Sequence, residues 1–214
     1  MAYTLISATP SPYARKVRIM LAEKKIPFTL QTEVPWDSTT QTPQYNPLEK
    51  LPVLIDSATG KAVYESHFIL DWIEAKHPHP PMLPTDVDGR LFAKQVEVVA
   101  DGICDALVLC FFEKQRDQPS EAWKERQMRK VQGGLQALAT WVEQNHGGPY
   151  LIGDSLTLAD IAAGSVLGYM AVRWPEHPWR EELPRLKAYW EALDQRESFA
   201  TTRPSPQKIS DRIV

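Results

Sequence analysis

The chain has 214 residues, which suits one large domain or two moderate ones. Its 43% hydrophobic and 24% charged residues are ordinary for a globular protein and exclude disorder on a large scale. A formal net charge of −3 gives no long-range attraction to phosphate backbones or acidic lipid surfaces. We therefore expect neither nucleic acid nor a membrane as a partner.

Two features predict a cytoplasmic protein. The first 16 residues lack the basic start and apolar run of a secretory signal, and no later stretch approaches the roughly 18 apolar residues of a spanning helix. Cys104 and Cys110 lie six residues apart on a predicted helix, where their side chains point to different faces. We expect both thiols to be free, as in a reducing compartment.

The first 80 residues alternate strand and helix signals. A short apolar strand is predicted at 3–7, and Pro12 can serve as the first residue of a helix. A second strand follows at 27–30, and 41–45 reads as a turn or short helix.

A hairpin and a helix complete this part of the chain. Residues 51–55 form a buried strand, 56–60 carry turn residues, and 61–64 return as the partner strand. The helix expected at 66–76 has an apolar stripe of Phe68, Ile69, Trp72 and Ile73. The order βαβ then ββα predicts an α/β thioredoxin-like N-terminal domain over residues 1–80.

Residues 77–84 contain four prolines, which cannot continue a helix and predict a stiff extended connection between two domains. The remainder, 88–214, predicts an all-α C-terminal domain. Two long helices are expected first, then a helix at 158–170 that is apolar on nearly every face and should be central. A last helix is expected around 186–193, and the tail from Arg203 looks irregular.

A capping box is predicted where the central helix begins. Thr157 and Asp160 have its spacing, and Leu156 and Ile161 occupy the positions of a hydrophobic staple. We interpret Asp160 as structural, with a loss of about 0.5 to 2 kcal/mol when the cap is removed.

The loop from Thr9 to Tyr13 ends the first strand and opens the first helix, where backbone amides and the helix dipole stabilise a thiolate. Ser11-Pro12-Tyr13-Ala14 has the spacing of the glutaredoxin Cys-Pro-Tyr-Cys with both cysteines replaced, so a ligand must bring the thiol. A free thiol titrates near about 8.5, and lowering its pKa by about two units needs roughly 2.7 kcal/mol. Ser11 is the candidate donor or else only an N-cap; Tyr13 and Thr9 are weaker candidate donors.

Two further segments suit a small charged ligand. Lys50, Leu51 and Pro52 lie in a loop before the third strand, where Lys50 is either a solvated charge or a carboxylate contact. Glu65 and Ser66 stand at the start of the next helix. The Ser66 hydroxyl and the free amides of the helix start suit a ligand carboxylate, and the negative charge of Glu65 suits a ligand ammonium. Alone, this pair would read as an N-cap serine after a surface glutamate.

These three segments, about 40 and 14 residues apart, together with Gly153–Asp160, resemble the glutathione S-transferase family over nearly the whole chain. The Ser11-Pro12-Tyr13 start and residues 100–106 and 196–200 are most similar to a serine-type bacterial branch. The loop from Thr9 to Tyr13 lacks the serine-rich pattern of the isomerase-like branch of the family, and it also lacks the active-site cysteine of the beta branch.

The resemblance implies a detoxification enzyme that binds glutathione as co-substrate and attacks a small hydrophobic electrophile with its thiolate. It implies a cis bond at Pro52, backbone contacts from Leu51, and glutathione contacts from Thr9, Tyr13, Lys50, Glu65 and Ser66. A homodimer is expected, in which Asp101 of one subunit reaches the glutathione ammonium bound to the other. Glu97, Asp101 and Asp105 share a helix face, which is otherwise a solvated ridge.

Aromatic and basic residues of the helical domain are candidates for the second-substrate pocket. Phe112, Tyr169, Arg173 and Trp174 are candidates for the electrophile pocket, although helical aromatics are more often core.

The five histidines, at 67, 77, 79, 146 and 177, lack ligand spacing, so no metal is expected. Lys24-Lys25 and Arg15-Lys16-Arg18 are interpreted as solvated or interface charges. A glutathione-dependent disulfide or peroxide reductase and a non-catalytic scaffold remain alternatives.

Overall fold

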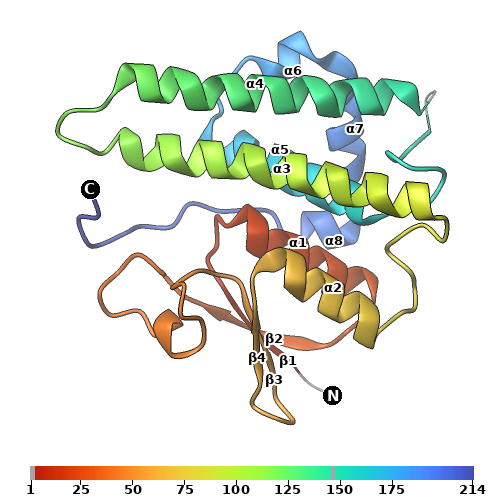
Figure 1. Ribbon diagram of the computed structural model, residues 1–214, viewed down its shortest axis with the longest axis horizontal. Coiled ribbons are helices and arrows are strands. Elements are labelled where there is room, and N and C mark those ends of the chain that lie inside the picture. The colour runs from red at the N-terminus through yellow and green to blue at the C-terminus, as the bar shows by residue number, and fades with distance from the viewer. Residues whose placement is uncertain (1–2, 146–147) are drawn as a thin grey trace. The chain divides into compact units, whose positions relative to one another are not determined.

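The computed structural model describes residues 3–145 and 148–214 (Figure 1). The chain divides into two compact units. The first contains the residues up to Met82 together with Glu197–Arg212, and the second contains Leu83–Arg196 with Ile213 and Val214. The division after Met82 lies within the proline-rich segment, whereas the expected helical domain, 88–214, differs at its C-terminal end.

The first unit is built on a four-stranded sheet in the order β2-β1-β3-β4. Its strands are β1 Tyr3–Ser7, β2 Phe28–Thr32, β3 Val53–Asp56 and β4 Ala62–Tyr64. β1 pairs with β2 in parallel, and β3 is antiparallel to both β1 and β4. This is the predicted thioredoxin-like order, and each strand lies within a few residues of its predicted range.

The register places three loops at one edge of the sheet. Ile6 lies opposite Val53, and Val53 lies opposite Tyr64. Because β3 runs against both neighbours, the end of β1, the start of β3 and the end of β4 meet at the same edge.

The helices of this unit are α1 Pro12–Glu23, α2 Ser66–Lys76 and the short 3₁₀ turn η1 Thr42–Gln44. α1 and α2 pack against each other on the same side of the sheet (Figure 1). The predicted start of α1 and both ends of α2 are confirmed. Each helix therefore begins at the sheet edge where the three loops meet.

The C-terminal segment belongs to the first unit because it covers α1. The short helix α8, Glu197–Ala200, contacts α1, and the Arg15 guanidinium donates to the Phe199 carbonyl at 3.1 Å. Arg15 and Lys16 are buried, at 2% and 1% exposure. The interpretation of these two residues as solvated was wrong, because helical spacing does not reveal cover from a distant segment.

Lys24 was also wrongly interpreted as solvated. Its side chain is fully buried, and Nζ lies 2.7 Å from Glu74 Oε2. It also donates to the carbonyls of His77 and Pro80, both at 2.7 Å. This single ammonium therefore fixes the start of the proline-rich segment, in which the His79–Pro80 bond is cis.

The second unit is helical. Its elements are α3 Val87–Glu113, α4 Glu121–Gln144, α5 Leu158–Arg173, α6 Trp179–Glu182 and α7 Pro184–Asp194. α3 lies beside α4 and also packs against α5, which contacts α7 (Figure 1). Every residue of α5 from Leu158 to Met170 is buried, which confirms the prediction that this helix is central.

The predicted capping box opens α5. Asp160 Oδ2 accepts the Thr157 N–H at 2.8 Å and its hydroxyl at 3.0 Å. Oδ1 accepts the Leu151 N–H and the Tyr189 hydroxyl, both at 2.8 Å. Asp160 is therefore a fully buried centre that joins α5, α7 and the segment before α5.

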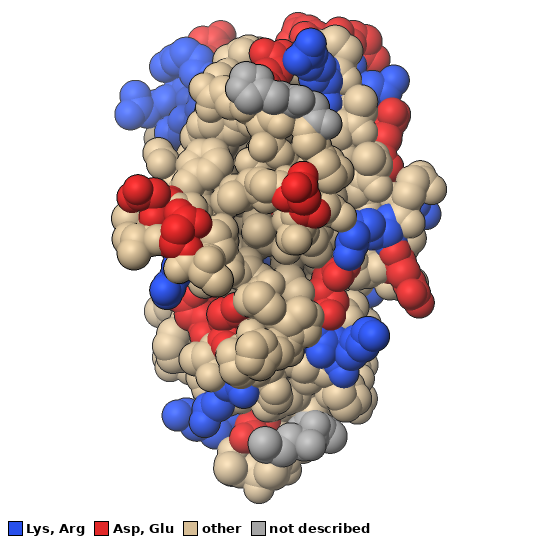
Figure 2. Space-filling model, turned by 90° about the vertical axis from the view of Figure 1, so that its right-hand side faces the viewer, with Lys and Arg blue, Asp and Glu red and all other residues tan. Residues whose placement is uncertain are grey.

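Cys104 and Cys110 are buried and are not joined by a disulfide, as predicted. Within residues 3–145 and 148–214, no helix combines the length and hydropathy that crossing a membrane requires. On the face shown in Figure 2, acidic and basic side chains are interspersed among uncharged ones.

Candidate functional site

The candidate site lies at the edge of the sheet where the first unit brings its three predicted segments together. The loop ending at Ser11 follows β1, Leu51-Pro52 precedes β3, and Glu65-Ser66 follows β4. Neighbouring strands are about 4.8 Å apart, so the first and third loops are separated by roughly 10 Å. An extended tripeptide spans about the same length.

Ser11 is the N-cap of α1. Its Oγ accepts the Ala14 N–H at 3.1 Å, and the side chain is half-buried. A hydroxyl has one proton to donate and two lone pairs, so the capping bond leaves the proton for another acceptor. The two interpretations of Ser11, N-cap and thiolate donor, are therefore compatible.

Thr9 uses its hydroxyl differently. It donates to the Ser205 carbonyl at 3.1 Å, and the Ser205 N–H donates to the Thr9 carbonyl at 3.3 Å. The single hydroxyl proton of Thr9 is thus engaged by the C-terminal segment. Tyr13 is half-buried on the first turn of α1. This pattern favours Ser11 over Thr9 as a donor to sulfur.

The second loop carries the expected cis bond between Leu51 and Pro52. Asn46, which the sequence reasoning did not single out, holds this loop: its Nδ2 donates to the Lys50 carbonyl at 2.8 Å and its Oδ1 accepts the Leu48 N–H at 2.9 Å. Asn46 is buried, whereas Lys50 is exposed. An asparagine followed by proline is typical of a turn, but nothing in that dipeptide indicates a buried amide.

Glu65, and not Ser66, is the N-cap of α2. Its two carboxylate oxygens accept the His67 and Phe68 N–H groups, both at 3.2 Å. Ser66 is the first helical residue; it is buried, and its hydroxyl donates to Glu65 Oε1 at 3.4 Å. The N-cap interpretation of Ser66 was therefore wrong, because the longer glutamate side chain folds back onto the helix.

This arrangement fixes a negative charge at the sheet edge. Glu65 has φ 72°, a conformation that costs a non-glycine residue about 1 to 3 kcal/mol and that concentrates at functional sites. Its carboxylate suits a ligand ammonium. Since the His67 and Phe68 amides already bind Glu65, a ligand carboxylate would rely on Ser66, whose hydroxyl would have to turn from Glu65 Oε1 to the ligand.

The acidic residues of α3 do not form a solvated ridge. Glu97 is fully buried and lies 3.2 Å from Lys94 Nζ, Asp101 is also buried, and Asp105 is exposed. The four-residue spacing of these acidic residues does not indicate which of them are buried and which is exposed. The role of Asp101 toward a second subunit stays a prediction.

The four candidates for the electrophile pocket lie at the C-terminal ends of α3 and α5. Phe112 packs edge-to-face against Phe111 at 5.1 Å between centroids, and the Arg173 guanidinium lies 4.8 Å from the Phe111 centroid. Lys114 Nζ lies 3.6 Å from the Trp174 centroid. Tyr169, one turn before Arg173, is buried, which raises the pKa of its phenol. Phe111 and Lys114 were not predicted.

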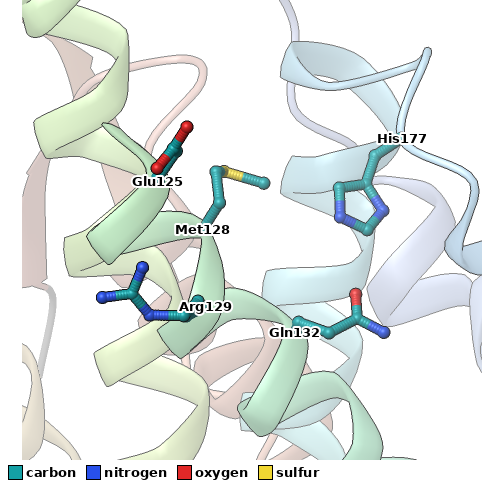
Figure 3. A pocket seen from close by; sticks show the side chains of 5 residues that line it. All are labelled: Glu125, Met128, Arg129, Gln132 and His177. Atoms are coloured by element: carbon teal, nitrogen blue, oxygen red, sulfur yellow. The ribbon is translucent and has the colours of Figure 1, made fainter. Parts of the chain in front are cut away.

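A pocket elsewhere in the second unit contains none of the predicted residues (Figure 3). Met128 and Gln132 of α4 point toward His177, which lies between α5 and α6. His177 Nδ1 accepts the Trp179 N–H at 3.2 Å, so the ring is anchored by the backbone. His146 lies outside the described residues, and the expectation of no metal stays a prediction.

Comparison with known proteins defines the class. Residues 10–76 match the N-terminal domain of glutathione S-transferase, and 121–192 match its C-terminal domain. The chain is 35% identical over 202 residues to the "Uncharacterized GST-like protein YibF" of Escherichia coli K12, covering 94% of this chain and 98% of that one. The chain belongs to the glutathione S-transferase family.

Two solved structures are especially similar. A glutathione S-transferase of Methylobacterium radiotolerans in complex with glutathione sulfonate is 56% identical over 100% of both chains, with a TM-score of 0.96. One from Methylobacillus flagellatus with glutathione bound is 33% identical, covers 95% of this chain and 100% of that chain, and has a TM-score of 0.88. The thioredoxin-like and helical units are thus those of a glutathione transferase.

Proposed function

We propose that this protein is a serine-type glutathione transferase that activates the glutathione thiolate for attack on a small hydrophobic electrophile. The observation that carries the proposal is the convergence of Ser11, cis-Pro52 and Glu65-Ser66 at one sheet edge, separated by the length of an extended tripeptide. Relatives whose structures contain glutathione or glutathione sulfonate support the choice of ligand.

Glutathione would lie extended along this edge, with its cysteine beside Leu51-Pro52. Its γ-glutamyl end would meet Glu65 through the ammonium and Ser66 through the carboxylate. Lys50 is exposed beside the second loop, where it would meet the other carboxylate. The sulfur then faces the start of α1, where the Ser11 hydroxyl donates to it.

The reaction needs a thiolate. The thiol proton leaves to solvent, the helix dipole and Ser11 stabilise the anion, and a sulfur–carbon bond forms as the electrophile accepts the electron pair or loses its leaving group. We assign the binding of the electrophile to a pocket lined by Phe112, Tyr169, Arg173 and Trp174. Homodimerisation, contact of Asp101 with a second subunit's ligand, a detoxification role and a cytoplasmic location complete the proposal.

The test is to titrate the purified protein with glutathione by calorimetry while following thiolate absorbance against pH. Binding with a thiol pKa about two units below 8.5 is expected. Absence of binding would overturn the proposal. Binding with an unshifted thiol pKa would leave a glutathione-binding protein without thiolate activation.

A further inference from the structure

Residues Arg203–Asp211, here called the C-terminal strap, run along the first unit and bond to it at three places. The strap has no helix or strand of its own. Its hydrogen-bond partners lie in the loop after β1 and in the loop after β2. Both loops are distant from the strap in the sequence. The absence of helix and strand over the strap agrees with the irregular tail predicted from Arg203 onwards.

The first anchor is Thr9, two residues before Ser11. Both of its bonds to the strap, at 3.1 and 3.3 Å, use the backbone of Ser205. Within the loop, the Ser11 N–H donates to the Ala8 carbonyl at 3.1 Å. The segment that presents Ser11 is therefore held by its own turn on one side and by the strap on the other.

The second anchor lies beside the end of β2. Gln207 Nε2 donates to the Glu33 carbonyl at 3.1 Å, and the Glu33 N–H donates to the Ser7 carbonyl at 2.9 Å. The strap is thus connected through Glu33 to the last residue of β1.

The third anchor is a reciprocal pair of aspartates. Asp37 Oδ1 accepts the Ser210 N–H at 2.8 Å and the Asp211 N–H at 3.2 Å. Asp211 Oδ2 in turn accepts the Ser38 N–H at 2.5 Å. These bonds are exposed, and exposed hydrogen bonds with little apolar burial belong to segments that open locally.

We propose that the C-terminal strap regulates the glutathione site: when docked, it holds the Thr9–Ser11 loop in the arrangement that binds the ligand. Thr9 and Asp37 act as positioning residues, the first beside the site and the second at the far end of the strap. The proposal rests on the proposed function. Because linkage is reciprocal, glutathione must stabilise strap docking by the same factor by which docking strengthens glutathione binding.

Amide hydrogen exchange of the full-length protein, with and without glutathione, tests this coupling. We expect glutathione to slow exchange of the Ser205, Ser210 and Asp211 amides. Asp37→Ala should accelerate exchange along the strap, including Ser205, and raise the glutathione Kd by about 5-fold or more, which is the lower end of typical allosteric couplings. Asp37→Asn keeps the accepting Oδ1 and should restore both values.

Lys208→Ala is the matched control, because it changes an exposed side chain of the same strap. It should leave exchange and affinity unchanged, and an unchanged unfolding midpoint will show that each variant is folded. Glutathione binding without slower strap exchange, or an Asp37→Ala protein with normal affinity, would overturn the coupling but not the proposed function. Absence of glutathione binding to the unaltered protein would overturn both.

Discussion

Ser11 Oγ accepts the Ala14 N–H at 3.1 Å and so caps α1 while its own proton stays free for a second partner. One atom therefore serves both the helix and, in our proposal, the ligand sulfur. The two roles have different consequences on substitution and can be measured separately.

Ser11→Ala should lower the conjugation rate at pH 7 about threefold or more, since a rise of one unit in the thiol pKa, from about 6.5 to about 7.5, reduces the thiolate fraction by that factor. Glutathione affinity should change little, because the substitution removes an interaction that acts on the thiolate. Loss of the cap should cost about 0.5 to 2 kcal/mol in the free energy of unfolding. Steady-state kinetics and urea denaturation give the two values.

Two variants separate the roles. Ser11→Thr keeps both the hydroxyl donor and the N-cap of α1, so it should retain activity. Ser11→Asp keeps the cap but brings a negative charge against the thiolate, so it should be stable and nearly inactive. A fully active Ser11→Asp protein would assign thiolate stabilisation to backbone amides or Tyr13.

Asp160→Ala should destabilise the protein by at least about 3 kcal/mol, because it leaves the Leu151, Thr157 and Tyr189 donors buried without an acceptor. Asp160→Asn should also be damaging, since its NH2 group would face a backbone N–H, of Thr157 or of Leu151, that can only donate. Tyr189→Phe, which removes one donor, should cost about 1 to 2 kcal/mol. Thermal or urea unfolding measures all three, and an Asn variant as stable as the parent would refute this account.

Lys24→Met should cost about 3 to 5 kcal/mol, because Glu74 and the His77 and Pro80 carbonyls lose their buried cation. Lys25→Met, at the exposed neighbouring position, is the control and should stay within about 0.5 kcal/mol. Equal effects of the two substitutions would show that the buried ammonium contributes nothing specific.

His77 should make stability depend on pH. Its Nε2 lies 2.9 Å from the Tyr3 hydroxyl, and burial with the nearby Lys24 and Lys76 charges lowers its pKa below 6.5. The unfolded chain therefore binds a proton at a higher pH than the folded one, so stability is lost as pH falls from about 6.5 through the lowered pKa.

Urea midpoints near pH 7.5 and pH 5, compared between the parent and His77→Gln, measure this contribution. The variant should lose less stability on acidification, with part of the dependence retained by His177, whose pKa is also lowered by burial. His79→Gln, at an exposed position, should behave like the parent. If His77→Gln has the same pH dependence as the parent, His77 is not the group that titrates.

Local patterns predicted the elements because each depends on neighbours in the chain. The strand at 3–7, the helix at 66–76 and the Thr157–Asp160 box were confirmed, since alternation, helical spacing and capping are short-range. The cis bond at Pro52 was predicted from the family resemblance and is confirmed.

Long-range contacts were not predictable in this way. Arg15 and Lys24 have the local signature of solvated helix residues, but Phe199 and Glu74 bring them into the interior. The engagement of Thr9 by Ser205 joins residues separated by 196 positions, for which no pattern in a single sequence gives a signal. The capping role of Glu65 was missed because serine is the commoner N-cap.

The pairing of Arg15 with Phe199 bears on how this protein is made and how it can be recombined. The first unit combines the residues up to Met82 with Glu197–Arg212, so it cannot be completed until both segments have emerged from the ribosome. A nascent chain that ends before Phe199 would leave the Arg15 guanidinium without its carbonyl acceptor. A chimera that borrows this unit from a relative must therefore transfer two separate pieces of sequence, one that precedes the second unit and one that follows it.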